Sequence, residues 1–147
     1  MKHLMIPLLL FLTPAMSAAQ TPESLQVVQN QDFLLSYTDI EELAADRVFK
    51  NAITLRLPAN VSKSKLYCTV VFNGSANEQL AQRISIKPAS VVLFPETSLS
   101  MQPRLLVELP ANSAAQDVVC DLIVQGQQKR TATGNYSFSL NFSTTLP

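Results

Sequence analysis

Apolar side chains occupy every second position in most of the longer runs of this chain. In the last run, serine and asparagine separate four apolar residues: Tyr136, Phe138, Leu140 and Phe142. The same alternation marks five earlier runs, which begin at Ile53, Leu66, Ile84, Leu105 and Val118. A period of two places one set of side chains on a buried face and the other in water, which is typical of antiparallel sheets. The chain is therefore predicted to be all-β.

Proline and glycine separate these runs, and the dipeptide Asn73-Gly74 is a strong turn signal. Residues 39–45 depart from the alternation, because Asp39 stands three positions before Glu42 in the pattern of a capped helical turn. Short strands at a spacing of about ten residues predict a β-sandwich. We expect seven or eight strands and one short helical turn.

Residues 1–19 have the composition of an export signal. Lys2 and His3 form a basic start, residues 8–12 are apolar, and Ser17, Ala18 and Ala19 are small. The apolar stretch is shorter than the roughly 20 residues needed to span a bilayer, and no later stretch replaces it. We expect cleavage after Ala19, no membrane span afterwards, and export to the periplasm, the cell surface or the medium. Residues 20–147 are then expected to form a single domain.

The two cysteines, Cys68 and Cys120, both fall on predicted buried faces. Cys68 shares its parity with Leu66 and Val70, and Cys120 shares its parity with Val118. An even number of cysteines in an exported chain favours a disulfide, which would stabilise the fold by about 4 kcal/mol in the chain-entropy model. Two buried free thiols are the alternative.

Catalytic and metal-binding residues are scarce in this sequence. The only histidine is His3, which leaves with the signal, so triads and histidine-ligated metals are excluded. Glu41 and Glu42 are adjacent and would diverge on a helical turn, whereas glycosidases need two opposed carboxylates. After removal of Lys2 the net charge is −1, which provides no positive field for nucleic acid. We expect no enzymatic activity, no cofactor, no metal and no nucleic-acid partner.

Three segments, RLLVELP, DVVCDLIV and TATGNYSFSLNFSTT, together resemble bacterial exported immunoglobulin-like domains of the fimbrial-subunit and spore-coat-U type. Those proteins end in a glycine, an aromatic residue and an alternating strand, which here correspond to Gly134, Tyr136 and the residues that follow. The resemblance spans residues 53–142 and implies an immunoglobulin-like antiparallel β-sandwich. In chaperone–usher pilins the sandwich lacks a strand, and a chaperone or a neighbouring subunit supplies it. Leu146 and Pro147 depart from the pilin pattern, so a self-complete sandwich is the alternative.

These observations predict a non-enzymatic exported structural or surface protein, a fimbrial-type or coat-type subunit that acts through strand-edge and face contacts. The expected assembly elements are the final strand and an N-terminal stretch that is either donated to a neighbour or folded back. The apolar residues of that stretch are Leu25, Val27, Phe33, Leu35 and Tyr37. The expected partners are proteins, either further copies of the chain or a periplasmic chaperone. The alternative is a soluble periplasmic or secreted binding module for carbohydrate, peptide or protein, which would use residues 73–83.

Overall fold

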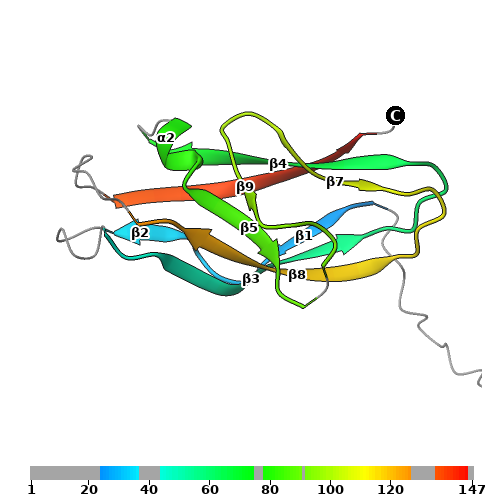
Figure 1. Cartoon of the computed structure of the whole chain (residues 1–147), viewed down its shortest axis with the longest axis horizontal. Helices are drawn as coiled ribbons and strands as arrows, with labels where there is room; N and C mark the ends of the chain where they lie inside the picture. The colour runs from blue at the N-terminus through cyan, green and yellow to red at the C-terminus, as the bar shows by residue number, and fades with distance from the viewer. Residues whose placement is uncertain (1–23, 37–43, 75–77, 91, 127–134, 146–147) are drawn as a thin grey trace, which may run out of the picture.

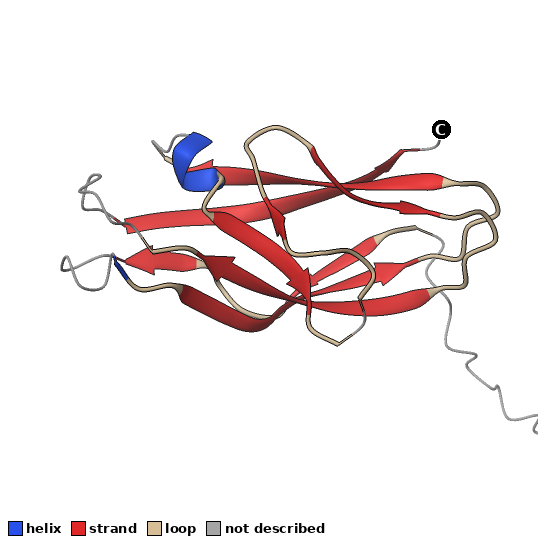
Figure 2. Ribbon diagram, in the orientation of Figure 1, coloured by secondary structure: helices blue, strands red, loops and turns tan. Residues whose placement is uncertain are grey.

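The computed structural model describes residues 24–36, 44–74, 78–90, 92–126 and 135–145 (Figure 1). Most of this part of the chain is β-strand, and the helix with described bounds is α2, Glu78–Ala81 (Figure 2). The predicted helical turn at residues 39–45 lies outside the described residues except for its last two positions, of which Ala44 is helical. The predicted export signal lies wholly outside them. None of the described helices is long and apolar enough to cross a membrane.

The strands form two antiparallel sheets. In order across the sheet, sheet A contains β1 (Gln26–Gln29), β3 (Arg47–Leu57), β8 (Gln116–Val124), β5 (Ile84–Pro88) and β6 (Thr97–Ser98). Sheet B contains β2 (Leu34–Ser36), β9 (Asn135–Thr145), β4 (Ser64–Asn73) and β7 (Arg104–Leu109). The two sheets lie face to face (Figure 1). The predicted immunoglobulin-like antiparallel sandwich is confirmed.

The predicted alternation places the expected side chains between the sheets. On β3, Ile53, Leu55 and Leu57 are buried, and on β4 and β8 the buried sets include Leu66 and Leu122. Side chains from both sheets form one continuous apolar core. Burial of a Leu or Ile side chain contributes roughly 1.5–3 kcal/mol, so this interior provides the main stabilising term of the fold.

The alternation fails on β7. The expected buried face included Leu105, but its side chain is 41% exposed, whereas Leu106 is buried. The cause is a register shift against β4, where Leu66 pairs with Val107 and the next residue, Tyr67, pairs with Leu105. Leu106 is the extra residue of this bulge, and one extra residue exchanges the two faces of a strand.

Candidate functional site

Strand β9 is hydrogen-bonded along most of its length on one side and only briefly on the other. On one side β4 pairs with residues 137–145, in a register that runs without interruption from Asn73↔Ser137 to Lys65↔Thr145. On the opposite side β2 pairs with residues 135–137. No strand in the described part of the chain pairs with residues 138–145 on that side. We call this side of residues 138–145 the open edge.

One hydrogen bond on β4 shows which backbone groups of β9 face the open edge. The Val70 N–H donates to the carbonyl oxygen of Ser100 at 2.9 Å, and therefore points away from β9. In an antiparallel pair both residues then direct their backbone groups outward, so Leu140, the partner of Val70, faces the open edge. The alternation extends this orientation to the even-numbered residues of the strand: Phe138, Leu140, Phe142 and Thr144. Tyr136, which pairs with Leu35 on β2, has the same parity.

The predicted assembly strand therefore contributes to two regions of the molecule. The side chains of Phe138 and Leu140 are buried, and that of Phe142 is partly buried against the core. The backbone groups of the same residues face the open edge. The side chain of Tyr136 lies outside the described part.

The N-terminal stretch is folded back onto its own domain in this structure. Phe33 is 3% exposed, and its ring stacks on that of Phe138 with the centroids 5.4 Å apart. The ring of Phe49 meets Phe33 edge-on at 5.7 Å. Leu25 packs partly buried against the core, whereas Val27 is 41% exposed. Of the other predicted donor residues, Leu35 belongs to β2 and Tyr37 lies outside the described residues.

The N-terminal stretch passes from sheet A to sheet B between β1 and β2. A bulge in β3 contacts the stretch where it crosses. Phe49 pairs with Leu122 and Ile53 pairs with Cys120, so residues 50–52 all lie opposite Asp121. Asn51 has a φ of 50°, a conformation that asparagine tolerates better than most residues. The bulge turns carbonyl groups toward the N-terminal stretch.

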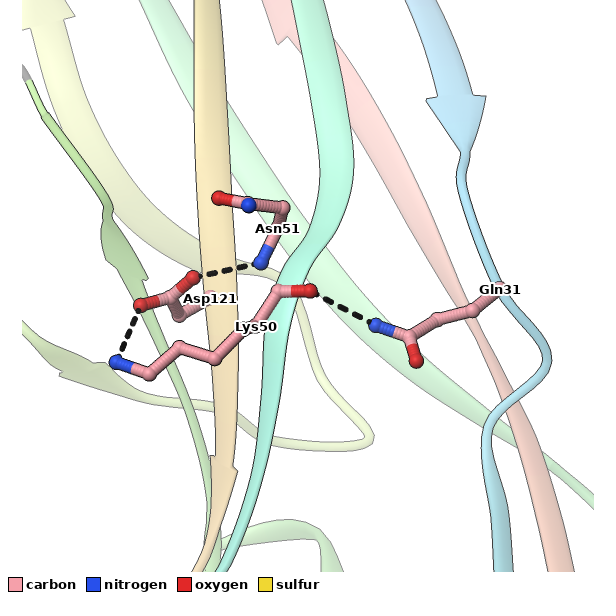
Figure 3. Close-up of polar contacts among 4 residues, drawn as sticks. All are labelled: Gln31, Lys50, Asn51 and Asp121. Atoms are coloured by element: carbon pink, nitrogen blue, oxygen red, sulfur yellow. Dashed lines mark hydrogen bonds and ion pairs between the residues drawn. The ribbon is translucent and has the colours of Figure 1, made fainter.

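Two amide side chains of the N-terminal stretch bind this bulge. The Asn30 Nδ2 donates to the carbonyl oxygen of Asn51 at 2.9 Å, and its backbone N–H donates to that of Ala52 at 2.9 Å. The Gln31 Nε2 donates to the carbonyl oxygen of Lys50 at 3.0 Å (Figure 3). Together with Asp121, these residues form what we call the crossover clamp: Asn30, Gln31, Lys50, Asn51 and Asp121.

Asp121 is the buried charge of the crossover clamp. Its Oδ1 accepts the Asn51 N–H at 2.8 Å and its Oδ2 lies 3.2 Å from the Lys50 Nζ (Figure 3). Burial acts to raise the pKa of Asp121, but the Asn51 hydrogen bond and the Lys50 ammonium outweigh it and hold the pKa below its usual range. Sequence reasoning missed this residue. Its signal was present, because one acid interrupts the apolar run of residues 118–124.

We expect Asp121→Asn to lower the free energy of unfolding at pH 7 by about 1–3 kcal/mol, because the Asn51 N–H in the bulge loses its charged acceptor, and the largely exposed Lys50 adds little to this loss. A lowered folded-state pKa contributes stability above the unfolded value near 3.9, and this stability is lost as the pH falls through the folded value. The difference between wild type and variant should therefore shrink in urea titrations below about pH 4. Asp117→Asn is the matched control on β8, since Asp117 is exposed and pairs with the exposed Arg56 at 3.8 Å. An equal loss in both variants would contradict the role of Asp121.

The predicted disulfide is absent from the structure, in which Cys68 and Cys120 are free thiols. The predicted placement is right, since both are fully buried in the core. Burial, and secondarily the neighbouring Cys120, raise the pKa of Cys68, and burial raises the pKa of Cys120 to about 12. Thiols with such pKa values stay protonated and unreactive, because only a thiolate enters disulfide chemistry.

The loop expected to serve the alternative binding function contains α2. The Glu78 carboxylate accepts hydrogen bonds from the Ser100 hydroxyl at 2.6 Å and from the Met101 N–H at 2.9 Å. These two bonds, the Ser100 bond first, lower the pKa of Glu78. Its carboxylate is thus engaged in fixing α2 to the segment before β7.

The chain matches no protein-family model and no curated protein sequence. Within the described ranges, no three His, Cys, Asp or Glu side chains are grouped as they would be to hold a metal ion. Function must therefore be inferred from the open edge and the crossover clamp themselves.

Proposed function

We propose that this protein is an exported, non-enzymatic structural subunit of the fimbrial or coat type. It assembles when a strand of a partner protein joins the open edge of β9. The observation that carries this proposal is the one-sided pairing of residues 138–145. The partner is a second copy of the chain or a periplasmic chaperone, and export through the N-terminal signal precedes assembly.

The composition of the open edge supports the proposal. Exposed edge strands are usually short, or carry lysine, other charges or proline, because these features prevent association with other chains. Residues 138–145 have the sequence FSLNFSTT, without any charge or proline. An added strand would pair with backbone groups that have no partner strand in the described part of the chain, and would cover Phe142.

The other sheet edges are protected. At the far side of sheet B, β7 carries Arg104 and Glu108, and Pro103 and Pro110 flank it. Glu108 also forms an ion pair with Lys65 at 3.3 Å. In sheet A, β6 has two residues and β1 has four. Among the described edges, that of β9 alone is both long and uncharged, which favours it as the assembly surface.

Two proline substitutions test the proposal. The Thr144 N–H faces the open edge, so Thr144→Pro should keep the β4 pairing and the unfolding midpoint while it weakens assembly about tenfold. Ser143→Pro is the matched control, because the Ser143 N–H faces Tyr67 on β4 and its loss should destabilise the fold. Light scattering over a concentration series measures assembly, and hydrogen exchange follows the amides of residues 138–145.

Protection of the even-numbered amides should rise on assembly of the wild-type chain. A wild-type chain that stays monomeric at every concentration, with those amides still exchanging freely, would contradict self-assembly. Equal assembly by Thr144→Pro and wild type would contradict the open edge as the contact.

A further inference from the structure

Cys68 and Cys120 lie on central strands of opposite sheets. Cys68 lies on β4, between Phe142 on β9 and Arg104 on β7. Cys120 lies on β8, between Ile53 on β3 and Pro88 on β5. Each side chain is 0% exposed, and both belong to the same apolar core. Both sulfur atoms therefore lie in the closed interface between the sheets.

Both thiols belong to one core cluster, and after burial the neighbouring Cys120 is the second cause that raises the pKa of Cys68. Their strands face each other across the core, and neighbouring strands flank each cysteine on both sides. An inter-sheet disulfide would therefore connect the centres of the two layers.

The closed sandwich nevertheless opposes formation of this bond. Oxidation by a small disulfide needs a thiolate and contact between that thiolate and the oxidant. Full burial prevents contact between the cysteine and the oxidant, and the low polarity of the core disfavours the charged thiolate. Both conditions are met in the unfolded chain, where a cysteine with a pKa near 8.5 is a few per cent ionised at pH 7.

We propose that Cys68 and Cys120 form an inter-sheet disulfide only before the two sheets close, so that the folded protein keeps whichever redox form it had when it folded. This inference rests on the proposed export to an oxidising compartment. The oxidant is a disulfide of a small thiol or of an oxidoreductase. One cysteine thiolate attacks it and releases one thiolate, forming a mixed disulfide. The second cysteine thiolate then attacks the mixed disulfide and releases the other thiolate. Two thiols are oxidised, one disulfide is reduced, and the two protons pass to the leaving thiolates.

The test compares oxidation of the reduced chain from residue 20 in two states, with oxidised glutathione as the probe. One sample is folded and the other is held in guanidinium chloride and then refolded. Aliquots are quenched in acid, denatured, and labelled with a maleimide polymer, so that free thiols are counted on a non-reducing gel. We expect the unfolded chain to form the intramolecular bond at least 100-fold faster than the folded chain. Equal rates would overturn the proposal.

Variants identify the route of the slow reaction. If oxidation requires opening of the sandwich, Phe33→Ala should oxidise faster by the same factor as it raises the unfolding equilibrium constant, and the exposed control Val27→Ala should not. The refolded oxidised chain should have an unfolding equilibrium constant about a thousandfold smaller than the reduced chain. Failure of the refolded chain to keep the bond would overturn the disulfide itself. Neither result depends on assembly through the open edge, because both assays are run on the monomer.

Discussion

Replacement of Phe33 by alanine is expected to lower the free energy of unfolding by about 3–5 kcal/mol. The ring is buried between Phe49 and Phe138, so its removal leaves a cavity where the N-terminal stretch enters sheet B. Protection of the β2 amides against hydrogen exchange should fall in the same variant, because Phe33 directly precedes β2. Urea denaturation followed by fluorescence or circular dichroism measures the first effect.

Val27→Ala is the matched control for this variant. Val27 lies in the same N-terminal stretch, but its side chain is 41% exposed, so we expect a loss below about 1 kcal/mol. A Phe33→Ala variant no less stable than the control would show that the stretch is not anchored by its aromatic ring.

Gly126→Ala is expected to lower the free energy of unfolding by about 3 kcal/mol, or to prevent folding. A Cβ at this position would lie 2.5 Å from the carbonyl carbon of Ala44 and 2.9 Å from that of Ala45, and closer still to the Ala44 oxygen. The Gly126 N–H also donates to the Asp46 Oδ1 at 2.7 Å, which holds the two segments together. Thermal and urea unfolding measure the loss.

Gly74→Ala separates the steric effect from the conformational effect. Gly74 has a φ of 109°, but a Cβ there would have no atom within 4 Å. We expect a cost of about 1–3 kcal/mol from backbone strain alone. At Gly126 any Cβ meets the backbone of Ala44 and Ala45, so Gly126→Asn should be at least as destabilising as Gly126→Ala, whereas Gly74→Asn should be tolerated better than Gly74→Ala. A Gly126→Asn variant as stable as the wild type would refute the steric account.

The alternation of apolar residues predicted the interior correctly wherever pairing is regular. Ile53, Leu55, Cys68 and Cys120 all point inward as their parity requires. The prediction failed at Leu105, because the bulge at Leu106 adds one residue to β7. A bulge depends on pairing with a distant strand, so local periodicity contains no information about it.

The open edge was beyond sequence reasoning for a related reason. Strict alternation marks a strand with one buried face, and it is the same for a central strand and for an edge strand. Which strand lies beside Leu140 is decided by backbone hydrogen bonds, which have no sequence signature. Asp121 was detectable as an acid within an apolar run. Its hydrogen-bond partner Asn51 belongs to a bulge in β3, which the alternation of apolar residues does not predict.

The oxidation state of the two cysteines is a third property that the sequence did not predict. Parity placed Cys68 and Cys120 correctly in the core. Under the inference above, whether they are bonded depends on the solution that the chain meets while it folds, and the pattern of residues contains no information about that solution.

The short pairing of β2 with residues 135–137 also limits how far along β9 an added strand could extend. An added strand could not extend past Phe138, because β2 already pairs with residues 135–137 on that side. At about 3.3 Å per residue, the open edge of residues 138–145 is roughly 26 Å long. In the proposed assembly this subunit therefore limits the length of the strand that it can accept, and a longer segment would have to turn away from the sheet beside Phe138.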